Sequence, residues 1–222
     1  MRGWFGTGGS SQLWGGWGTY QFVPPESLPP VPKSEGPDEF AWLRAAPNTE
    51  APLGPMKEPA VEPRLDALTT EANELGLEVP PSLRTFMLDP SLHGKVPTCT
   101  CCYLDLSTKL IPLPDENMPG RLLRFLNDQQ CCILWYLHLL PNGEHKVVCA
   151  SPEFKREEVS GGTLEDGIAK LHNLVVCAEG FEEFIRRFWV ENWVWFGEQG
   201  GEELEGEVKD YVEFVKRAKG GE

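Results

Sequence analysis

One stretch, residues 131–149, restricts the possible folds of this chain more than any other. Its first half is almost continuously apolar, so that Trp135 and Tyr136 would point to opposite faces of an extended segment. Asn142-Gly143 follows, and a second β-prone run leads to Cys149. Asn-Gly between two such runs is typical of a β-hairpin. Because both faces of the first strand are apolar, both must be covered, and the strand is predicted to lie at the centre of a sheet.

Four further segments show the spacing of amphipathic helices. The apolar residues on their four faces are Leu65, Leu68, Ala72 and Leu75; Leu83, Phe86 and Met87; Phe181, Phe184, Ile185, Phe188 and Trp189; and Leu204, Val208, Tyr211, Val212 and Val215. Gly76 stands where it would end the first helix, and Pro81 or Ser82 would begin the second. The third face predicts a helix over residues 181–190, with Arg186-Arg187 toward its end, where the helix dipole favours positive charge.

Shorter β-prone runs account for the rest of the regular chain. Strands are predicted within residues 98–113, 120–125 and 174–178. Trp193 and Trp195 are interpreted as alternate residues on one face of a strand, and residues 151–167 as a polar surface loop. Strands and helices in this irregular order predict an α+β fold, in which a mainly antiparallel sheet is packed by helices.

The first 63 residues differ in composition from the remainder. They hold 11 of the 20 prolines and 9 of the 23 glycines, and the prolines at 24–25, 29–30 and 32 favour an extended polyproline conformation. The chain is therefore divided into a Pro/Gly/Trp-rich extension over 1–63, an α+β domain over 64–196, and an acidic linker with a terminal helix over 197–222. The aromatic residues of the extension leave two alternatives open. The extension folds back onto the domain, or it is a ligand segment for a groove on another protein.

Net charge and hydropathy exclude several classes of protein. The chain has 34 acidic against 20 basic side chains, a formal charge of −14, which argues against a nucleic-acid binder because phosphates repel it. The densest apolar run, residues 131–140, is shorter than the ~20 residues of a membrane span, and no signal peptide is visible. A cytoplasmic protein with a basic protein partner is expected, although solubility alone also accounts for the acidity.

No catalytic residue, cofactor site or metal site is predicted. The seven cysteines are an odd number and are expected to be reduced thiols. Cys99–Cys102 with Cys131-Cys132 is the one candidate metal cluster, but its spacing is poor for a tetrahedral site, and core packing is favoured. His138 and His145 flank the hairpin turn, and Cys149 with His138 is an alternative nucleophile pair, yet no oxyanion hole or orienting residue accompanies them. The chain is therefore expected not to be an enzyme.

Three groups of residues occur in a recognisable order. The first is Glu74–Pro80 followed by Leu83–Met87, a predicted helix, a leucine-proline turn and a second helix. The second is Arg124–Gln130 with Leu134–Leu137, in the predicted central strands. The third is Cys177–Phe184, a predicted strand followed by a helix. Together these groups resemble the opening, the central strands and the final strand and helix of the SUKH superfamily, which includes fungal regulators of cell-wall synthesis and bacterial toxin-immunity proteins.

The resemblance covers residues 64–196 and departs at Asp89–Gly94, where the family often has a glycine pair. It implies an α+β domain with a mainly antiparallel sheet, and protein binding rather than catalysis. On this basis we expect an immunity-type protein that neutralises a basic, nuclease-like toxin by direct binding. The alternative is a regulatory or scaffold module that engages other proteins through its N-terminal and C-terminal extensions. The candidate partner-binding residues are acidic pairs in predicted loops, Asp115, Glu116, Glu157, Glu158, Glu165 and Asp166.

Overall fold

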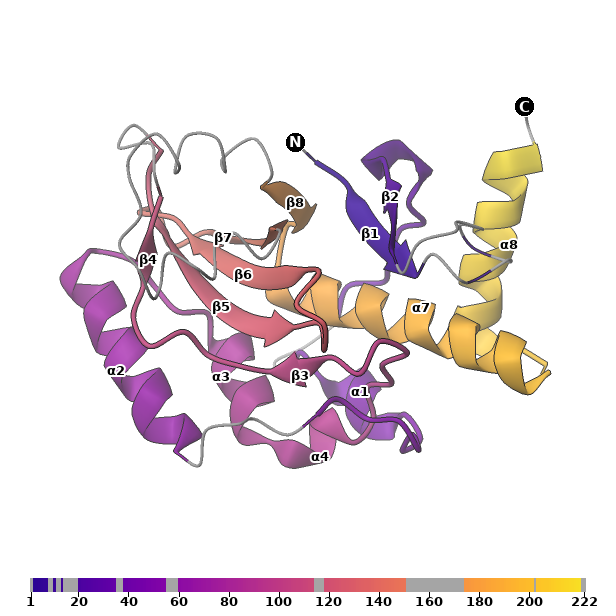
Figure 1. The fold of residues 1–222 in the computed structure, drawn as a ribbon, viewed down its shortest axis with the longest axis horizontal. Helices are drawn as coiled ribbons and strands as arrows, with labels where there is room; N and C mark the ends of the chain where they lie inside the picture. The colour runs from indigo at the N-terminus through magenta and orange to yellow at the C-terminus, as the bar shows by residue number, and fades with distance from the viewer. Residues whose placement is uncertain are drawn as a thin grey trace.

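The computed structural model describes residues 2–7, 10, 13, 20–34, 38–54, 60–113, 118–150, 174–201 and 203–220. Within this part of the chain the fold is α+β, as predicted, and helices pack an antiparallel sheet (Figure 1). The strands are β1 (Trp4–Thr7), β2 (Tyr20–Val23), β3 (Tyr103–Leu104), β4 (Ile111–Pro112), β5 (Arg121–Asn127), β6 (Leu134–Leu139), β7 (His145–Ala150) and β8 (Val175–Ala178). The helices are α1 (Ala41–Ala45), α2 (Val61–Glu74), α3 (Pro81–Leu88), α4 (Pro90–His93), α7 (Phe181–Gly200) and α8 (Gly206–Gly220), with a short 3-10 turn, η1 (Pro25–Ser27).

The main sheet of the described residues has six strands in the order β3-β5-β6-β7-β8, with β4 also paired to β5, and every pairing is antiparallel. Strand β6 lies between β5 and β7, as its two apolar faces predict. The hairpin is confirmed, because the N–H of Leu140 donates to the carbonyl of Glu144 at 2.9 Å and Gly143 has φ +77°. An Asn-Gly turn requires such a left-handed φ, which glycine adopts without a Cβ clash.

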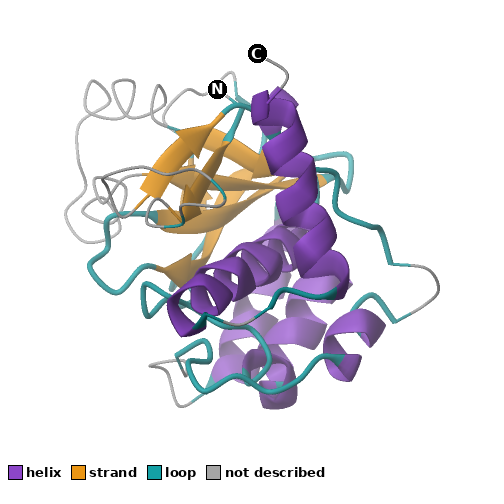
Figure 2. Cartoon of the chain, turned by 90° about the vertical axis from the view of Figure 1, so that its right-hand side faces the viewer, coloured by secondary structure: helices purple, strands orange, loops and turns teal. Residues whose placement is uncertain are grey.

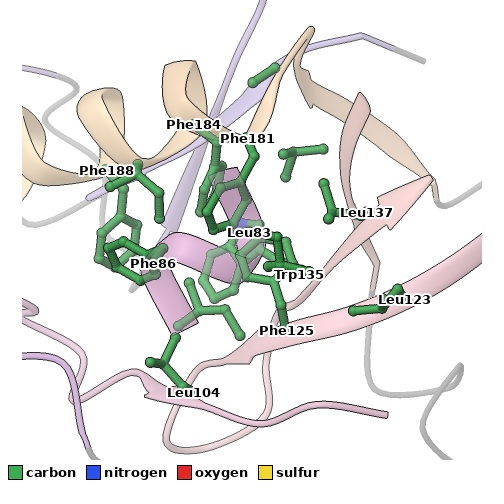
Figure 3. Close-up of a cluster of buried hydrophobic side chains, with 14 of the residues drawn as sticks. Leu83, Phe86, Leu104, Leu123, Phe125, Trp135, Leu137, Phe181, Phe184 and Phe188 are labelled. Atoms are coloured by element: carbon green, nitrogen blue, oxygen red, sulfur yellow. The ribbon is translucent and has the colours of Figure 1, made fainter. Parts of the chain in front are cut away.

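Helix α7 covers one face of the sheet, and the largest core lies between them (Figure 3). Phe181, Phe184 and Phe188 project from α7 toward Phe125 of β5 and Trp135 of β6. The ring centroids of Phe125 and Phe181 are 5.2 Å apart and those of Trp135 and Phe188 are 6.0 Å apart, both edge to face. Each such pair adds about 0.5–1.5 kcal/mol to the burial of its rings. The periodic face predicted from the sequence is therefore the face that closes the core.

Helices α2 and α3 pack on the same core. The first three predicted apolar residues of α2 are buried, whereas Leu75 is 45% exposed. The reason is that α2 ends at Glu74, so that Leu75 lies in the cap and leaves the buried face. Gly76 has φ +67° and follows the helix end, as predicted. Helix α3 begins at Pro81, one of the two predicted start points, and buries the three predicted apolar residues.

Helix α7 is longer than predicted. It runs for 20 residues to Gly200, so the strand predicted at Trp193 and Trp195 is wrong, and the boundary placed at residue 196 falls inside the helix. The physical reason is a second apolar face, in which Val190 and Val194 are four residues apart and pack on the buried side of α8. Alternate tryptophans imitate a strand, but the contact with α8 determines the conformation.

The N-terminal extension contributes to the main core. Trp4, Phe40 and Leu43 are each at most 3% exposed and belong to the same cluster as the phenylalanines of α7. Strands β1 and β2 form a small separate sheet beside β8, where the N–H of Gly3 donates to the carbonyl of Val176 at 3.0 Å (Figure 1). These contacts support the alternative in which the extension folds back onto the domain. The composition changes at residue 63 without a boundary in the hydrophobic core.

Candidate functional site

All six acidic residues predicted to bind a partner lie outside the described residues: Asp115, Glu116, Glu157, Glu158, Glu165 and Asp166. The loop predicted over residues 151–167 lies outside them as well. The described part of the chain offers a different surface, where the proline-rich part of the extension meets α7 and α8.

Residues 24–32, here termed the proline strap, are held by two neighbouring arginines of α7. Arg187 donates from Nη1 to the carbonyl of Pro29 at 2.8 Å, and Arg186 donates from Nη1 to the carbonyl of Pro32 at 2.9 Å. The two carbonyls are three residues apart, which is one turn of a polyproline helix, so they face the same side. The backbone is extended at Pro24 and Leu28, as the prolines predict, but the prediction is wrong at Pro25, which begins the 3-10 turn η1. The side chains of α7 therefore bind the main-chain carbonyls of the strap.

Sequence reasoning missed the role of these two arginines. They were predicted near the end of their helix, but α7 continues to Gly200, and Arg186 and Arg187 are buried, at 9% and 4% exposure. Their carbonyl partners lie 154 and 158 residues earlier in the chain. Contacts over such separations leave no trace in local periodicity, so the only available signal was the placement of two adjacent cations beside an apolar helical face.

A buried network ties the strap to β1 and α8. Glu191, 1% exposed, accepts from the indole Nε1 of Trp4 and from the hydroxyl of Tyr211, each at 2.8 Å. Arg187 donates to the same hydroxyl at 3.1 Å. Burial, together with the Glu191 carboxylate, raises the pKa of Tyr211 well above its ordinary value, so the phenol remains a hydrogen-bond donor. Removing one partner of such a network leaves a buried charge uncompensated, so its geometry is strongly held.

Arg186 fastens α8 to the same place. Its Nε and Nη2 donate to the two carboxylate oxygens of Glu207 at 2.8 and 2.9 Å, and its guanidinium lies 5.0 Å from the ring centroid of Trp42. Bidentate arginine–carboxylate pairs are among the strongest and most directional polar contacts in proteins. Figure 2 shows the result, with α8 standing upright across α7. The strap, α7 and α8 thus form one anchored unit, termed the strap surface.

Three hollows border the strap surface, and strap residues form part of the wall of each. A hollow of about 290 Å³ lies between the strap and β8, one of about 390 Å³ between the strap and α8, and one of about 260 Å³ between β2, the strap and the end of α8. In the hollow beside α8, Pro29, Pro30 and Pro32 form one wall, and Tyr211 and Phe214 belong to the other. Apolar walls of this kind suit the side chains of a protein partner.

Carboxylate side chains line two of the hollows. Glu179 and Glu183 line the hollow beside β8, and Glu207 and Asp210 line the hollow beside α8. The first two pair with basic side chains, and Glu207 pairs with Arg186. Asp210 is exposed, and its side chain makes no hydrogen bond or ion pair with any described residue. Its negative charge is therefore available at the edge of an apolar hollow.

The cysteines do not form a common site. All seven are free thiols, of which Cys102, Cys149 and Cys177 are buried, whereas Cys101 and Cys132 are exposed. The core packing predicted for the two cysteine clusters is therefore right for Cys102 and wrong for the exposed pair. Burial raises the pKa of Cys102 to about 11, so that thiol stays protonated and unreactive. In the described ranges, no three or more His, Cys, Asp and Glu side chains gather in a way that could hold a metal ion.

The turn after β5 explains why Cys132 is exposed. Asp128 accepts the backbone N–H of Gln130 at 2.9 Å through Oδ1 and the hydroxyl of Tyr20 at 2.8 Å through Oδ2. Cys131 follows in a left-handed conformation with φ 56°. This side-chain-capped turn directs the chain away from the sheet, and Cys132 lies at its exposed edge. The cluster is thus part of a turn and not part of a strand.

The two hairpin histidines lie apart, and each has its own partner. His138 is opposite Lys146 and His145 is opposite Leu139, so the two imidazoles are on successive rungs and on opposite faces of the sheet. Nε2 of His138 lies 2.8 Å from the carbonyl of Pro119, and Nε2 of His145 accepts the N–H of Phe181 at 3.2 Å.

The alternative nucleophile pair is not formed either. Cys149 pairs with Trp135 and points into the core, three rungs away from His138 and on the other face of the sheet. The geometry therefore gives no support to a Cys–His nucleophile at these positions.

A second buried polar group lies on β5. Arg124 donates from Nη2 to Asp105 at 3.2 Å, and Nδ2 of Asn127 donates to the same carboxylate oxygen at 2.7 Å. The N–H of Asp105 also donates to the carbonyl of Phe125 at 3.1 Å. These contacts fix the segment between β3 and β4 on the sheet, so their role is structural.

No family model, curated protein or solved structure matches this chain. None of the helices in the described ranges is both long enough and apolar enough to cross a membrane.

Proposed function

We propose that this chain is a non-enzymatic protein-binding domain of the SUKH type that acts in the cytoplasm and neutralises a basic, nuclease-like protein by direct contact. The observation that carries the proposal is the strap surface, where three hollows follow the strap and Asp210 offers a carboxylate without a partner among the described residues. A basic partner would bury apolar side chains in the hollows, and the formal charge of −14 would steer it there.

Two further features support this proposal. The order of elements, two helices, a central antiparallel sheet, and a last strand followed by a long helix, matches the order on which the SUKH resemblance rests. The strap surface is also anchored before any partner arrives, because Arg186 and Arg187 bind the strap while Glu207 and Tyr211 bind α8 to them. A surface ordered in advance loses less conformational entropy on binding.

The test is to co-express the full chain with each protein encoded beside its gene and to isolate any complex by size exclusion. The activity of the bound partner is then measured as increasing amounts of the chain are added. We expect a stoichiometric complex with a basic protein whose activity falls in proportion to the complex formed. The absence of a complex with every neighbouring protein would contradict the proposal.

A second candidate function is a regulatory or scaffold module. One observation favours it, which is that two of the three hollows have walls from the strap and α8, and both of these segments lie outside the domain predicted over residues 64–196. A scaffold holds its partner without covering the active site of that partner. The same titration separates the two functions, because a partner that stays fully active in a stoichiometric complex supports the scaffold and contradicts neutralisation.

A further inference from the structure

We propose that the hollow between the strap and α8 binds an arginine side chain of a protein partner, with Asp210 as the carboxylate that receives the guanidinium. This inference rests on the proposed function, since it assigns the contact by which a basic partner would be held. It goes further by naming the side chain, the hollow and the residue that recognises it.

The unit already binds one guanidinium of its own. Arg186 is held by three groups, the carboxylate of Glu207, the carbonyl of Pro32 and the face of the Trp42 ring. A carboxylate, a proline carbonyl and an aromatic ring satisfy the charge, the donors and the flat face of a guanidinium. The chain thus contains a working example of the chemistry that the neighbouring hollow offers to a partner.

Asp210 repeats part of this arrangement one turn further along α8. It follows Glu207 by three residues, so both carboxylates lie on the same side of the helix and line the same hollow. The carboxylate of Glu207 is occupied by Arg186, whereas Asp210 is exposed and has no partner among the described residues. Phe214 follows Asp210 by four residues, is half-buried, and brings its ring to the same wall.

The shape of the hollow selects arginine. Its volume of about 390 Å³ lies in the range of protein ligand pockets, and the strap prolines Pro29 and Pro30 supply an apolar wall for the aliphatic stem. A guanidinium is weakly hydrated, stacks on aromatic rings and pairs with a carboxylate through two hydrogen bonds. A lysine ammonium is more strongly hydrated and offers neither the flat face nor the paired donors, so it should bind less tightly.

The positive charge of Arg217 determines from which end of the hollow the partner's arginine enters. Arg217 lines the same hollow, and its Nε donates to the carbonyl of Glu213 at 3.2 Å. It follows Asp210 by seven residues, which is about 10 Å along a helix. The positive charge of Arg217 opposes a second guanidinium at that end, so the partner's arginine enters at the Asp210 end. The two residues should therefore affect binding with opposite signs.

The experiment uses the full chain and a defined probe, the capped tripeptide acetyl-Gly-Arg-Gly-amide, with lysine and citrulline versions for comparison. Binding is followed by two-dimensional NMR of the labelled chain. We expect saturable shifts at Asp210, Phe214 and the strap, with the arginine peptide binding more tightly than the lysine peptide. Citrulline keeps the shape but not the charge, so its affinity should be lower by about tenfold or more. Shifts spread evenly over the acidic surface, or none in the hollow, would overturn the inference.

Three variants make the test specific. Asp210→Asn should weaken arginine-peptide binding by about tenfold, because a charge-assisted hydrogen bond becomes a neutral one. Glu74→Gln removes the same charge from the exposed surface of α2 and should leave binding unchanged. Arg217→Gln should tighten binding, because it removes the positive charge that opposes the guanidinium, and weaker or unchanged binding would contradict the assigned direction of entry. Asp210 and Arg217 are both exposed, so these variants are expected to fold, as their amide spectra will verify. Equal losses in Asp210→Asn and Glu74→Gln would reduce the effect to net charge and overturn the inference.

The failure of this inference can be told apart from the failure of the proposed function. A partner that is neutralised equally well by the wild type and by Asp210→Asn leaves the function in place and overturns the arginine site. A peptide that binds in the hollow while every neighbouring protein fails to form a complex supports the arginine site and contradicts neutralisation.

Discussion

Glu191 is the residue of α7 that joins β1 to α8. It is buried in α7 and accepts hydrogen bonds from Trp4 of β1 and from Tyr211 of α8. In Glu191→Gln one acceptor oxygen becomes a donor that faces another donor, and the buried Arg187 loses a nearby negative charge. We expect the free energy of unfolding to fall by about 3–5 kcal/mol. Urea unfolding measures it, and Glu213→Gln, which changes an exposed residue of α8, should alter stability little. Equal stability of the two variants would mean that the network is not what holds these elements.

His145 makes the stability of the fold depend on pH. Its Nε2 accepts the N–H of Phe181 at the start of α7, and burial lowers the pKa of the imidazole below its ordinary 6.5. The unfolded chain therefore binds a proton more readily than the folded chain. Stability is fully present above pH 6.5 and is lost as the pH falls through the lowered pKa.

The variant His145→Gln tests this dependence. Its urea midpoint, compared at neutral and mildly acidic pH, should change less than that of the wild type. Burial also lowers the pKa of His93, which acts with the same sign, so part of the dependence should remain in the variant. An identical change of midpoint in both proteins would show that His145 plays no part.

Residue-scale contacts divide into those that sequence can predict and those that it cannot. Gly76 and Gly143 were predicted correctly, because a helix end and a hairpin turn each demand a left-handed residue at one local position. Arg186 was misjudged, because its carbonyl and carboxylate partners come from the strap and from α8. Local sequence therefore predicts where the backbone needs a particular conformation. It does not predict which distant group a side chain will contact.

Among the elements, β5 is preceded by a residue that lies very close to β6. Gly120 has φ +101°, and a Cβ there would lie 2.0 Å from the carbonyl oxygen of Leu139 on β6. Gly120→Ala must therefore push β5 away from β6, and we expect a loss of about 3 kcal/mol. Gly76→Ala is the matched control, since Gly76 also has a positive φ but has nothing within 4 Å. It should lose only the left-handed strain, about 1–2 kcal/mol. Equal losses in thermal or urea unfolding would contradict the close contact of β5 with β6.

The strands and helices could be predicted where the buried apolar residues repeat with a single spacing, either that of a strand or that of a helix. The 131–149 hairpin and the first half of α7 each have one clear period, and both are confirmed. The second half of α7 was predicted wrongly, because Trp193 and Trp195 satisfy a strand pattern while the valines that pack on α8 satisfy a helical one. The sequence there fits both a strand and a helix, and the contact with α8 favours the helix.

For the whole molecule, the shared core predicts a single cooperative unit. Trp4 and Phe40 from the extension pack in the same cluster as α7, and α8 is joined to α7 by a third cluster. Unfolding followed by tryptophan fluorescence and by far-ultraviolet circular dichroism should therefore give coincident curves in urea. A separate early transition of the extension or of α8 would show that the compositional divisions at residues 63 and 196 are also divisions of stability.

The fold class could be predicted from the sequence, but the candidate site could not. Alternating and helical periods gave the α+β architecture. The acidic pairs chosen from predicted loops lie outside the described residues, whereas the strap surface brings together the two ends of the chain. Asp210 and the prolines of the strap are about 180 residues apart, and no local pattern indicates that they share a hollow.

The most direct test of the central claim is the rate at which the full chain associates with the proposed basic partner in stopped-flow mixing at low and at high salt. If the acidic surface steers the partner to the strap surface, the association rate should fall steeply as salt rises, since screening shortens the field to ~8 Å at physiological ionic strength. The rate for Asp210→Asn should be close to that of the wild type, and its complex should dissociate faster, because one local contact is lost. An association rate indifferent to salt, with a partner that is itself acidic, would contradict the account.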